Sequence, residues 1–449
     1  MPSPFSIADS RLRELAQEVL DHARNLGASD CSCEASESTG LSVTTRKGQV
    51  ETIENTRDKG LGITVYLGQR RGHSSTSDFS GAAIRQAVQA AYDIARYTAV
   101  DEAAGLPDVD EFERHPLDLD LFHPWALDSD RAIEIARRAE DAAFAVSRQI
   151  VNSEGANVHT GCDQFVLANS RGFVGGYPQS RHSVSVAPIA RGRGGMQRDD
   201  WYSSTRVSSE LAQPEAIGTY AAQRALARLG ARKLRTRQCP VLFEAPVACG
   251  LLGNFVQAAS GGALYRKASF LVDGLGKSLF ARHVTVREDP FVRRGLGSSP
   301  FDEEGVRGRA RDVVARGILE GYFLSCYSAR KLGMKSTGNA GGSHNLQLLS
   351  SETGAGDDFR AMLRKLGTGL LVTELIGMGV DYVNGDYSRG ASGFWVENGA
   401  IVHPVEEITI AGNLRGMFAG VAAVGSDVVV RGGKSTGSVL IEAMTVGGS

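Results

Sequence analysis

The 449-residue sequence lacks the long apolar runs that mark membrane insertion. No segment approaches the roughly 20 uninterrupted apolar residues that a helix needs to cross a bilayer. The first residues, Met1–Arg13, contain no apolar core of signal-peptide length. We therefore expect no membrane span, no secretory leader and a cytoplasmic location.

The chain also has almost no net charge. Its 49 Lys and Arg residues are balanced by 51 Asp and Glu residues, which gives a formal charge of −2. Proteins that bind nucleic acid or anionic membranes usually present a basic stripe or patch. The sequence offers no such stripe, so we expect neither nucleic acid nor a membrane surface as a partner.

Cysteine is scarce and is not arranged for metal or redox chemistry. The six cysteines are scattered, and no pair has the C-x-x-C spacing of a zinc knuckle or a redox site. Buried, inert thiols in a reducing compartment are therefore expected.

The common catalytic and phosphate-binding motifs are also absent. No two of the nine histidines are spaced i,i+4 with an acid between them, and no serine sits in a Gly-x-Ser-x-Gly elbow. Two Gly-Lys-Ser triplets, 276–278 and 433–435, resemble the end of a phosphate loop. The upstream glycine that this motif requires is replaced by Leu271 and Val428, so both triplets are predicted to be turns.

What the sequence has in excess is glycine. There are 54 glycines but only 13 prolines, and hydrophobic residues make up 42% of the chain. These values are typical of a globular protein with many turns, and the length indicates two or three domains.

The hydrophobic periodicity predicts an α+β fold. Three/four spacing predicts helices over 12–26, 80–97, 129–146 and 214–229, and alternating segments with glycine turns lie between them. The turns at 46–48 and 170–172 are loosely alike, which suggests duplicated helix–meander units. We expect an N-terminal α+β domain (1–100), a middle α+β domain (101–235) and a β-rich C-terminal domain (236–449).

The C-terminal region contains many short apolar runs separated by glycine turns. One predicted strand covers 317–325, Asn398-Gly399 predicts a hairpin, and helices are expected at 246–259 and 357–366. This pattern favours a closed or sandwich-like β domain with a few helices, because such domains avoid open strand edges.

Two segments carry the candidate site residues. The stretch 385–399 holds four glycines and reads as an ordered loop with Asp386, Tyr387, Ser388 and Arg389. His344 and Asn345 end a second glycine-rich loop, 338–345. We regard both segments as candidate peptide-channel surfaces, with packing of the C-terminal domain as the alternative.

Several separated segments together resemble the TldD/PmbA family of metallopeptidase subunits, and within it the PmbA (TldE) branch. The resemblance covers essentially the full length. It rests on Leu61–Tyr66, Leu119–Pro124, Gly262–Lys267, Ser299–Val306, Tyr327–Gly333, Gly385–Gly390 and Glu407–Leu414.

The resemblance implies that the catalytic metal is not held by this chain. TldD-type subunits bind zinc through a His-Glu-x-x-x-His helix and a cysteine near the C-terminus. In this sequence the corresponding positions fall at Gly253, Asn254, Ala258 and Thr436, which supply no zinc ligand. No catalytic residue and no cofactor are therefore expected here, and zinc is expected in a partner subunit.

The family further implies that this chain pairs with a TldD-like subunit and acts on unfolded peptides. It would contribute to the substrate channel and to the dimer contact, and would form a homodimer when alone. An alternative is a non-catalytic adaptor, since family members have been called modulators of DNA gyrase. A third hypothesis, catalysis by His344 and Asp386, lacks any supporting motif.

Overall fold

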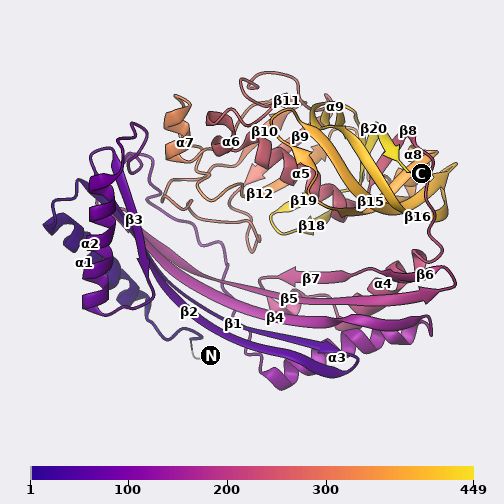
Figure 1. Ribbon diagram of the computed structural model, residues 1–449, viewed down its shortest axis with the longest axis horizontal. Coiled ribbons are helices and arrows are strands. Elements are labelled where there is room, and N and C mark those ends of the chain that lie inside the picture. The colour runs from indigo at the N-terminus through magenta and orange to yellow at the C-terminus, as the bar shows by residue number, and fades with distance from the viewer. Residues whose placement is uncertain (1–2, 449) are drawn as a thin grey trace.

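The computed structural model describes residues 3–448, which form three sheets with helices packed around them (Figure 1). The helices are α1 (Asp9–Asn25), α2 (Gly81–Tyr97), α3 (Ser129–Val146), α4 (Pro214–Ala227), α5 (Ala245–Ala259), α6 (Gly261–Tyr265), α7 (Cys326–Lys331), α8 (Phe359–Leu366) and α9 (Leu414–Ala419). No helix in this range is long and apolar enough to cross a membrane.

The N-terminal half is built on one antiparallel sheet, with the strand order β3-β2-β1-β4-β5-β6 and β7 paired to β5. Its strands are β1 (Asp30–Arg46), β2 (Gln49–Leu67), β3 (Arg70–Thr76), β4 (Ile150–Asn169), β5 (Val174–Gly192), β6 (Gly195–Arg198) and β7 (Trp201–Thr205). Because β1 pairs with both β2 and β4, the sheet runs across the expected boundary at 100/101.

The order of elements recurs within this sheet. Helix α1, the long hairpin β1–β2, a short strand and α2 are followed by α3, the long hairpin β4–β5, short strands and α4. The first hairpin turns at Lys47-Gly48, both with positive φ, as a tight hairpin turn requires. The two helix–hairpin units join edge to edge through β1 and β4.

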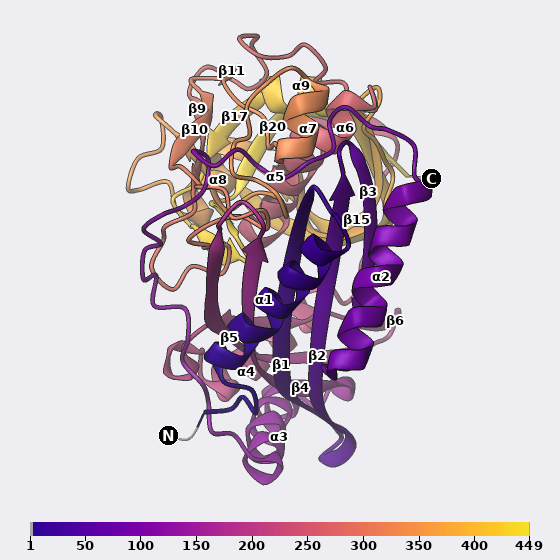
Figure 2. The ribbon, with the colours of Figure 1, turned by 90° about the vertical axis from the view of Figure 1, so that its left-hand side faces the viewer.

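Helices cover one face of the sheet. Cys31, Cys33 and Ala35 alternate along β1 and are buried with α1 and α2, while Leu41 and Val43 continue the same face under α3. Figure 2 shows α1 and α2 lying across these strands. The opposite face looks toward the C-terminal half, so the alternation along β1 separates the core side from the side available to a ligand.

The C-terminal half contains a closed ring of strands. The pairings β13–β8, β8–β20, β20–β16, β16–β15 and β15–β13 return to their starting strand. These strands are β8 (Arg237–Phe243), β13 (Gly369–Ile376), β15 (Asp386–Glu397), β16 (Ala400–Asn413) and β20 (Val439–Gly447), with β14 (Val380–Asp381) and β17 (Val421–Val424) at the margin. The closed β architecture predicted for this region is confirmed.

A second C-terminal sheet has the order β11-β10-β9-β12-β19-β18. Its strands are β9 (Val284–Asp289), β10 (Arg311–Ala315), β11 (Ile318–Leu319), β12 (Asn345–Ser350), β18 (Val429–Arg431) and β19 (Lys434–Thr436).

The strand predicted over 317–325 is wrong beyond Leu319. There, scattered contacts satisfy the main chain in place of a ladder: Arg311 donates to the Tyr322 carbonyl, the Phe323 amide donates to the Ala259 carbonyl, and the Leu324 amide donates to Thr337 Oγ1.

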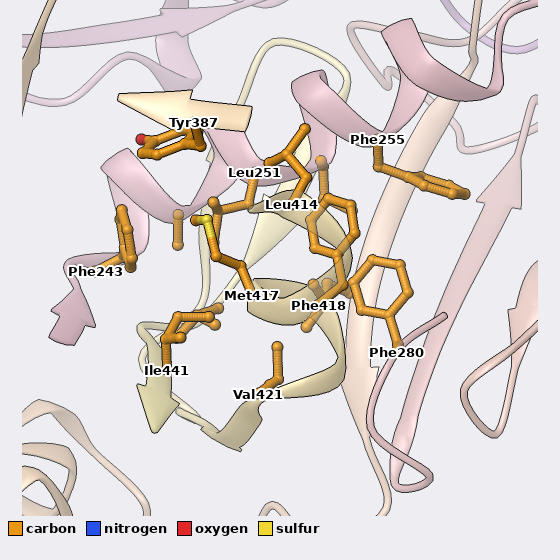
Figure 3. Close-up of a cluster of buried hydrophobic side chains, with 14 of the residues drawn as sticks. Phe243, Leu251, Phe255, Phe280, Tyr387, Leu414, Met417, Phe418, Val421 and Ile441 are labelled. Atoms are coloured by element: carbon orange, nitrogen blue, oxygen red, sulfur yellow. The ribbon is translucent and has the colours of Figure 1, made fainter. Parts of the chain in front are cut away.

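Helix α5 is enclosed by the ring and the second sheet and forms the centre of the C-terminal core. The Phe255 ring meets Phe280 and Phe418 edge-to-face, with ring centroids 5.6 and 6.3 Å apart (Figure 3). It meets Phe323 in the same way at 5.9 Å. The six cysteines are all buried and unpaired, as the sequence indicated.

A buried carboxylate fixes the segment that leads into α1. Glu37 on β1 is only 1% exposed and accepts hydrogen bonds from Ser6 Oγ at 2.6 Å and from the amides of Ser6 and Ile7. Burial alone would raise the pKa of Glu37, but these donors outweigh it, and the pKa lies below its ordinary 4.5.

Glu37→Gln should therefore lower the free energy of unfolding at pH 7 by about 2 kcal/mol, because it removes charge-assisted hydrogen bonds. A carboxyl with a depressed folded-state pKa stabilises the protein above its unfolded pKa and loses that contribution as the pH falls. The difference between wild type and variant should thus shrink below about pH 4.5, in urea unfolding series measured from pH 7 to pH 3. A constant difference across this range would contradict the assignment.

Candidate functional site

Residues Gly253–Ala258, which resemble the metal-binding helix of the family, lie inside α5 as predicted. The stripe Leu251, Leu252, Phe255 and Ala259 is buried at 3% exposure or less. Burial of this stripe holds the helix rigidly against the core, so the side chains on its other face have fixed positions.

The residues that the resemblance places at the four metal positions have other surroundings. Asn254 Oδ1 accepts a hydrogen bond from the Tyr382 hydroxyl at 3.0 Å, and Ala258 is fully buried in the core. The Thr436 hydroxyl is buried and donates to the Gly437 carbonyl at 3.0 Å. Gly253 has no side chain and borders a cavity.

These residues do not fit a zinc ion. Zinc in proteins is held by thiolate, imidazole or carboxylate ligands, and the set glycine, asparagine, alanine and threonine contains none of them. Within residues 3–448, no cluster of three or more His, Cys, Asp or Glu side chains is arranged to hold a metal ion.

His344 lies in a loop that is fixed from several sides. Its amide and the Asn339 side chain both donate to Glu288 Oε1, a carboxylate that is 1% exposed. The ring Nε2 donates to the Gly338 carbonyl at 2.8 Å. The neighbouring Asn345 donates to the Asp289 carbonyl and accepts from the Gly297 amide. Both side chains therefore hold loops together.

The His344 loop forms one wall of a cleft of about 640 Å³ between the two halves of the molecule. The opposite wall is the open face of the N-terminal sheet, including Glu34 and Asp163, together with Arg206 just after β7. His344 lines this cleft, but within residues 3–448 its lining includes neither Asn345 nor any of Asp386–Arg389.

The cleft has an acidic character. Glu34, Glu37, Asp58, Asp163, Asp302 and Glu303 line it, against Lys59 and Arg206. Burial raises the pKa of Asp163, which the Gln179 side chain partly offsets by donating at 2.7 Å. Enclosure also raises the pKa of Glu34, and the nearby Glu303 carboxylate adds to this shift.

The N-terminal wall of the cleft was not identified from the sequence. Glu34, Ser36 and Ser38 alternate with the buried Cys33, Ala35 and Glu37 along β1. This polar face was a visible signal, because a strand with one packed face presents the other to solvent or to a partner surface. The sequence does not indicate which segment lies opposite this polar face, because that depends on tertiary contacts alone.

Most of the glycine-rich stretch 385–399 is a strand and not a loop, which corrects the interpretation made from its composition, while the hairpin turn predicted at Asn398-Gly399 is confirmed. Residues Asp386–Glu397 form strand β15 within the closed ring. Its glycines allow close strand contact: a Cβ on Gly393 would lie 1.8 Å from the Leu371 carbonyl oxygen. The composition was misleading because glycine relieves crowding between strands as well as bending loops.

The side chains of Asp386–Arg389 alternate across the strand. Asp386 and Ser388 are exposed, and Asp386 accepts from Asn413 Nδ2 at 3.2 Å. Tyr387 is 1% exposed and points into the hydrophobic cluster (Figure 3), and burial raises its pKa to about 12. Within residues 3–448 the Tyr387 hydroxyl and Arg389 Nε are buried without a hydrogen-bond partner.

The hypothesis of a His344–Asp386 catalytic pair gains no geometric support. His344 lies in the loop before β12 and uses Nε2 as a donor to a backbone carbonyl, while Asp386 begins β15 of the ring and accepts a hydrogen bond from Asn413. A general base must have its proton-accepting atom within hydrogen-bond reach of the substrate or of a catalytic partner. The structure brings these two side chains to different surfaces.

Comparison with known proteins identifies the whole chain. Three domains of the PmbA/TldA metallopeptidase family match it: domain 1 over residues 33–95, the central domain over 122–229 and the C-terminal domain over 236–448. Metalloprotease PmbA of Escherichia coli O157:H7 is 47% identical over 439 residues, which cover 97% of each chain.

Solved structures agree with this assignment. A protein of Bacteroides thetaiotaomicron VPI-5482, described as a candidate modulator of DNA gyrase, superposes with a TM-score of 0.92 at 26% identity, covering 99% of this chain and all of that one. TldE from Thermococcus kodakarensis has the same fold, with a TM-score of 0.83 at 18% identity, covering 97% of this chain and 100% of the other.

Proposed function

Because this chain belongs to the PmbA/TldA metallopeptidase family, we propose that it is the PmbA/TldE-type subunit of a cytosolic metalloprotease complex that processes unfolded peptides. In this complex the chain carries no cofactor. A TldD-like subunit supplies the zinc and the catalytic groups, and this chain contributes to the peptide channel and the dimer contact. Without that partner, the chain forms a homodimer.

The composition of α5 is the observation that carries the proposal. Its core-facing side keeps the packing that a rigid catalytic helix needs, while the residues at the metal positions, Gly253, Asn254 and Ala258, cannot bind zinc. A chain that keeps this fold but lacks the zinc ligands is best explained as the partner of a related subunit that binds the metal. Related chains of one fold pair naturally across a pseudo-two-fold axis.

The cleft between the two halves supports a role in peptide binding. Its volume of about 640 Å³ admits an extended peptide but no folded domain, and its floor is the face of a sheet. Peptides bound mainly through their main chain are accepted with little regard to sequence. His344 would shape this channel as a fixed loop residue and not as an acid or base.

The direct test is co-expression with a TldD-like subunit that carries a His-Glu-x-x-x-His motif. The purified chain alone should hold no stoichiometric zinc and cleave no unstructured peptide. The co-purified complex should cleave such peptides and lose this activity on chelation, with recovery on adding zinc. One tightly held zinc per chain in the isolated protein, measured by elemental analysis, would overturn the proposal.

A second candidate is a non-catalytic adaptor, which the description of the Bacteroides structure as a candidate modulator of DNA gyrase favours. The net charge of −2 argues against direct contact with DNA, so such an adaptor would act on a protein. Affinity purification from native extract separates the two functions. A partner with a zinc-binding helix supports the first, and a partner without one supports the second.

A further inference from the structure

A second cavity, of about 400 Å³, lies over the glycine-bearing side of α5. Its wall includes Gly250 and Gly253 of α5, Trp201 of β7, and Arg431 and Lys434 of the β18–β19 hairpin. It shares no lining residue with the cleft at His344 among residues 3–448. Its volume falls within the range of small-ligand sites.

Two cations face this cavity from one hairpin. Arg431 and Lys434 lie directly opposite each other in the β18–β19 pair, so their side chains project from the same face. Like charges in this register destabilise a hairpin. Neither side chain forms an ion pair with an acid among residues 3–448, and the Arg431 guanidinium lies 4.4 Å and 4.1 Å from the rings of Trp201 and Tyr202. The pair is thus held in place without a counter-ion.

The acids of the cavity wall are occupied by other cations. Asp199 lies 3.1 Å from Arg224 Nε and 3.6 Å from Arg228. Glu374 is paired with Arg228 and Arg198. Asp200 lies 3.8 Å from Arg198, and burial raises the pKa of its carboxyl. The positive charge of Arg431 and Lys434 therefore remains available to a ligand.

Next to these cations, α5 presents two residues without side chains, Gly250 and Gly253. Glycine is unfavourable inside a helix, so a glycine pair there calls for a reason. Close packing does not explain these glycines, because a Cβ on Gly250 would meet nothing within 4 Å and a Cβ on Gly253 would meet only Lys434 Cε at 3.8 Å. The open space belongs to the cavity, and it allows an extended main chain to lie against α5. On the same wall, Thr373 Oγ1 is buried without a hydrogen-bond partner.

We propose that this cavity binds the C-terminal carboxylate of a peptide, with Arg431 and Lys434 on the carboxylate and the last peptide residues against Gly250 and Gly253. A carboxylate between two cations relieves the repulsion within the hairpin and forms charge-assisted hydrogen bonds. The peptide identity of the ligand rests on the proposed function, whereas the two-cation site rests on the geometry alone.

The test uses the full-length chain without any partner, so that failure to assemble with a TldD-like subunit leaves it unaffected. Binding of N-acetyl-tetra-alanine is compared by calorimetry with binding of its C-terminal amide. The free acid should bind at least about tenfold more tightly than the amide. Lys434→Gln and Arg431→Gln should each remove this preference.

Two controls make the outcome specific. Lys277→Gln alters the exposed lysine of the other Gly-Lys-Ser triplet and should change nothing, while Lys434→Arg should retain the preference. Because Lys434→Gln relieves a like-charge pair, it should also raise the unfolding temperature while weakening binding, which distinguishes it from a misfolded variant. Equal affinity for acid and amide, or inorganic phosphate binding as tightly as the free acid, would overturn the proposal.

Discussion

Replacing Arg224 with methionine should lower the free energy of unfolding by about 3–5 kcal/mol, the usual cost of removing one partner from a buried ion pair. Arg224 on α4 donates to Asp199 at 3.1 Å and to both oxygens of Glu244 at 2.8 and 3.0 Å. The paired side chains are only 10–13% exposed. Methionine fills similar space but leaves Glu244 buried without its cation.

The same ion pair joins the two halves of the molecule. Arg224 belongs to the helix layer of the N-terminal sheet, whereas Glu244 immediately precedes α5 in the C-terminal half. Arg224 also donates to the carbonyl of Thr373, which lies on β13 of the ring. Its loss should therefore loosen the contact that positions the N-terminal sheet over the C-terminal half. We expect the two halves of the variant to unfold in separate transitions.

The pH dependence provides an internal check. Burial raises the pKa of Glu244, and Arg224 opposes that shift. Without Arg224 the folded-state pKa of Glu244 rises further, and a carboxyl with a raised folded-state pKa loses stability as the pH rises through that range. The penalty of Arg224→Met should consequently be smaller at pH 5 than at pH 8.

Urea unfolding followed by circular dichroism measures this penalty. The matched control is Arg138→Met, which breaks the exposed Arg138–Glu215 pair between α3 and α4, with exposures of 36% and 49%, and should cost less than about 1 kcal/mol. Equal penalties for the two variants would show that the Arg224 cluster does not stabilise the fold.

Local structure was the part of the fold that the sequence predicted well. The helix over 129–146 was placed at its observed bounds because the spacing of its apolar residues is a local signal. The single N-terminal sheet was not foreseen. It depends on β1 pairing with β4, whose residues lie more than 100 positions away, and alternation of side chains does not specify a distant partner.

In the candidate site, too, local features could be predicted and contacts between distant segments could not. The helix around Gly253 could be predicted because its apolar stripe has helical spacing within one segment, while its match to the family's metal positions stays a prediction. The residues opposite His344, such as Glu34 and Arg206, could not be assigned, because only the fold brings the sheet face and the loop together. The stretch 385–399 was misread as a loop because its glycines serve contacts between strands that are remote in sequence.

Gly393→Ala should strongly destabilise the C-terminal half, with a loss on the order of 4 kcal/mol or more. A Cβ at this position would lie 1.8 Å from the Leu371 carbonyl oxygen and 2.9 Å from its carbon, and both are backbone atoms that no side-chain rotation can move. Gly393 pairs with Val372 on β13 and with Val405 on β16, so the clash falls where β15 joins both neighbours in the ring.

The control is Gly416→Ala on α9, where a Cβ would meet nothing within 4 Å. Because alanine is the better helix former, this change should be neutral or stabilise the protein by up to about 1 kcal/mol. Thermal unfolding and soluble yield compare the two variants. If Gly393→Ala unfolds within a degree or two of wild type, the strands must separate there at little cost, and the closed ring cannot be what fixes β15. A large loss of stability for Gly393→Ala, with none for Gly416→Ala, would show that the glycine at position 393 is needed for closing the ring.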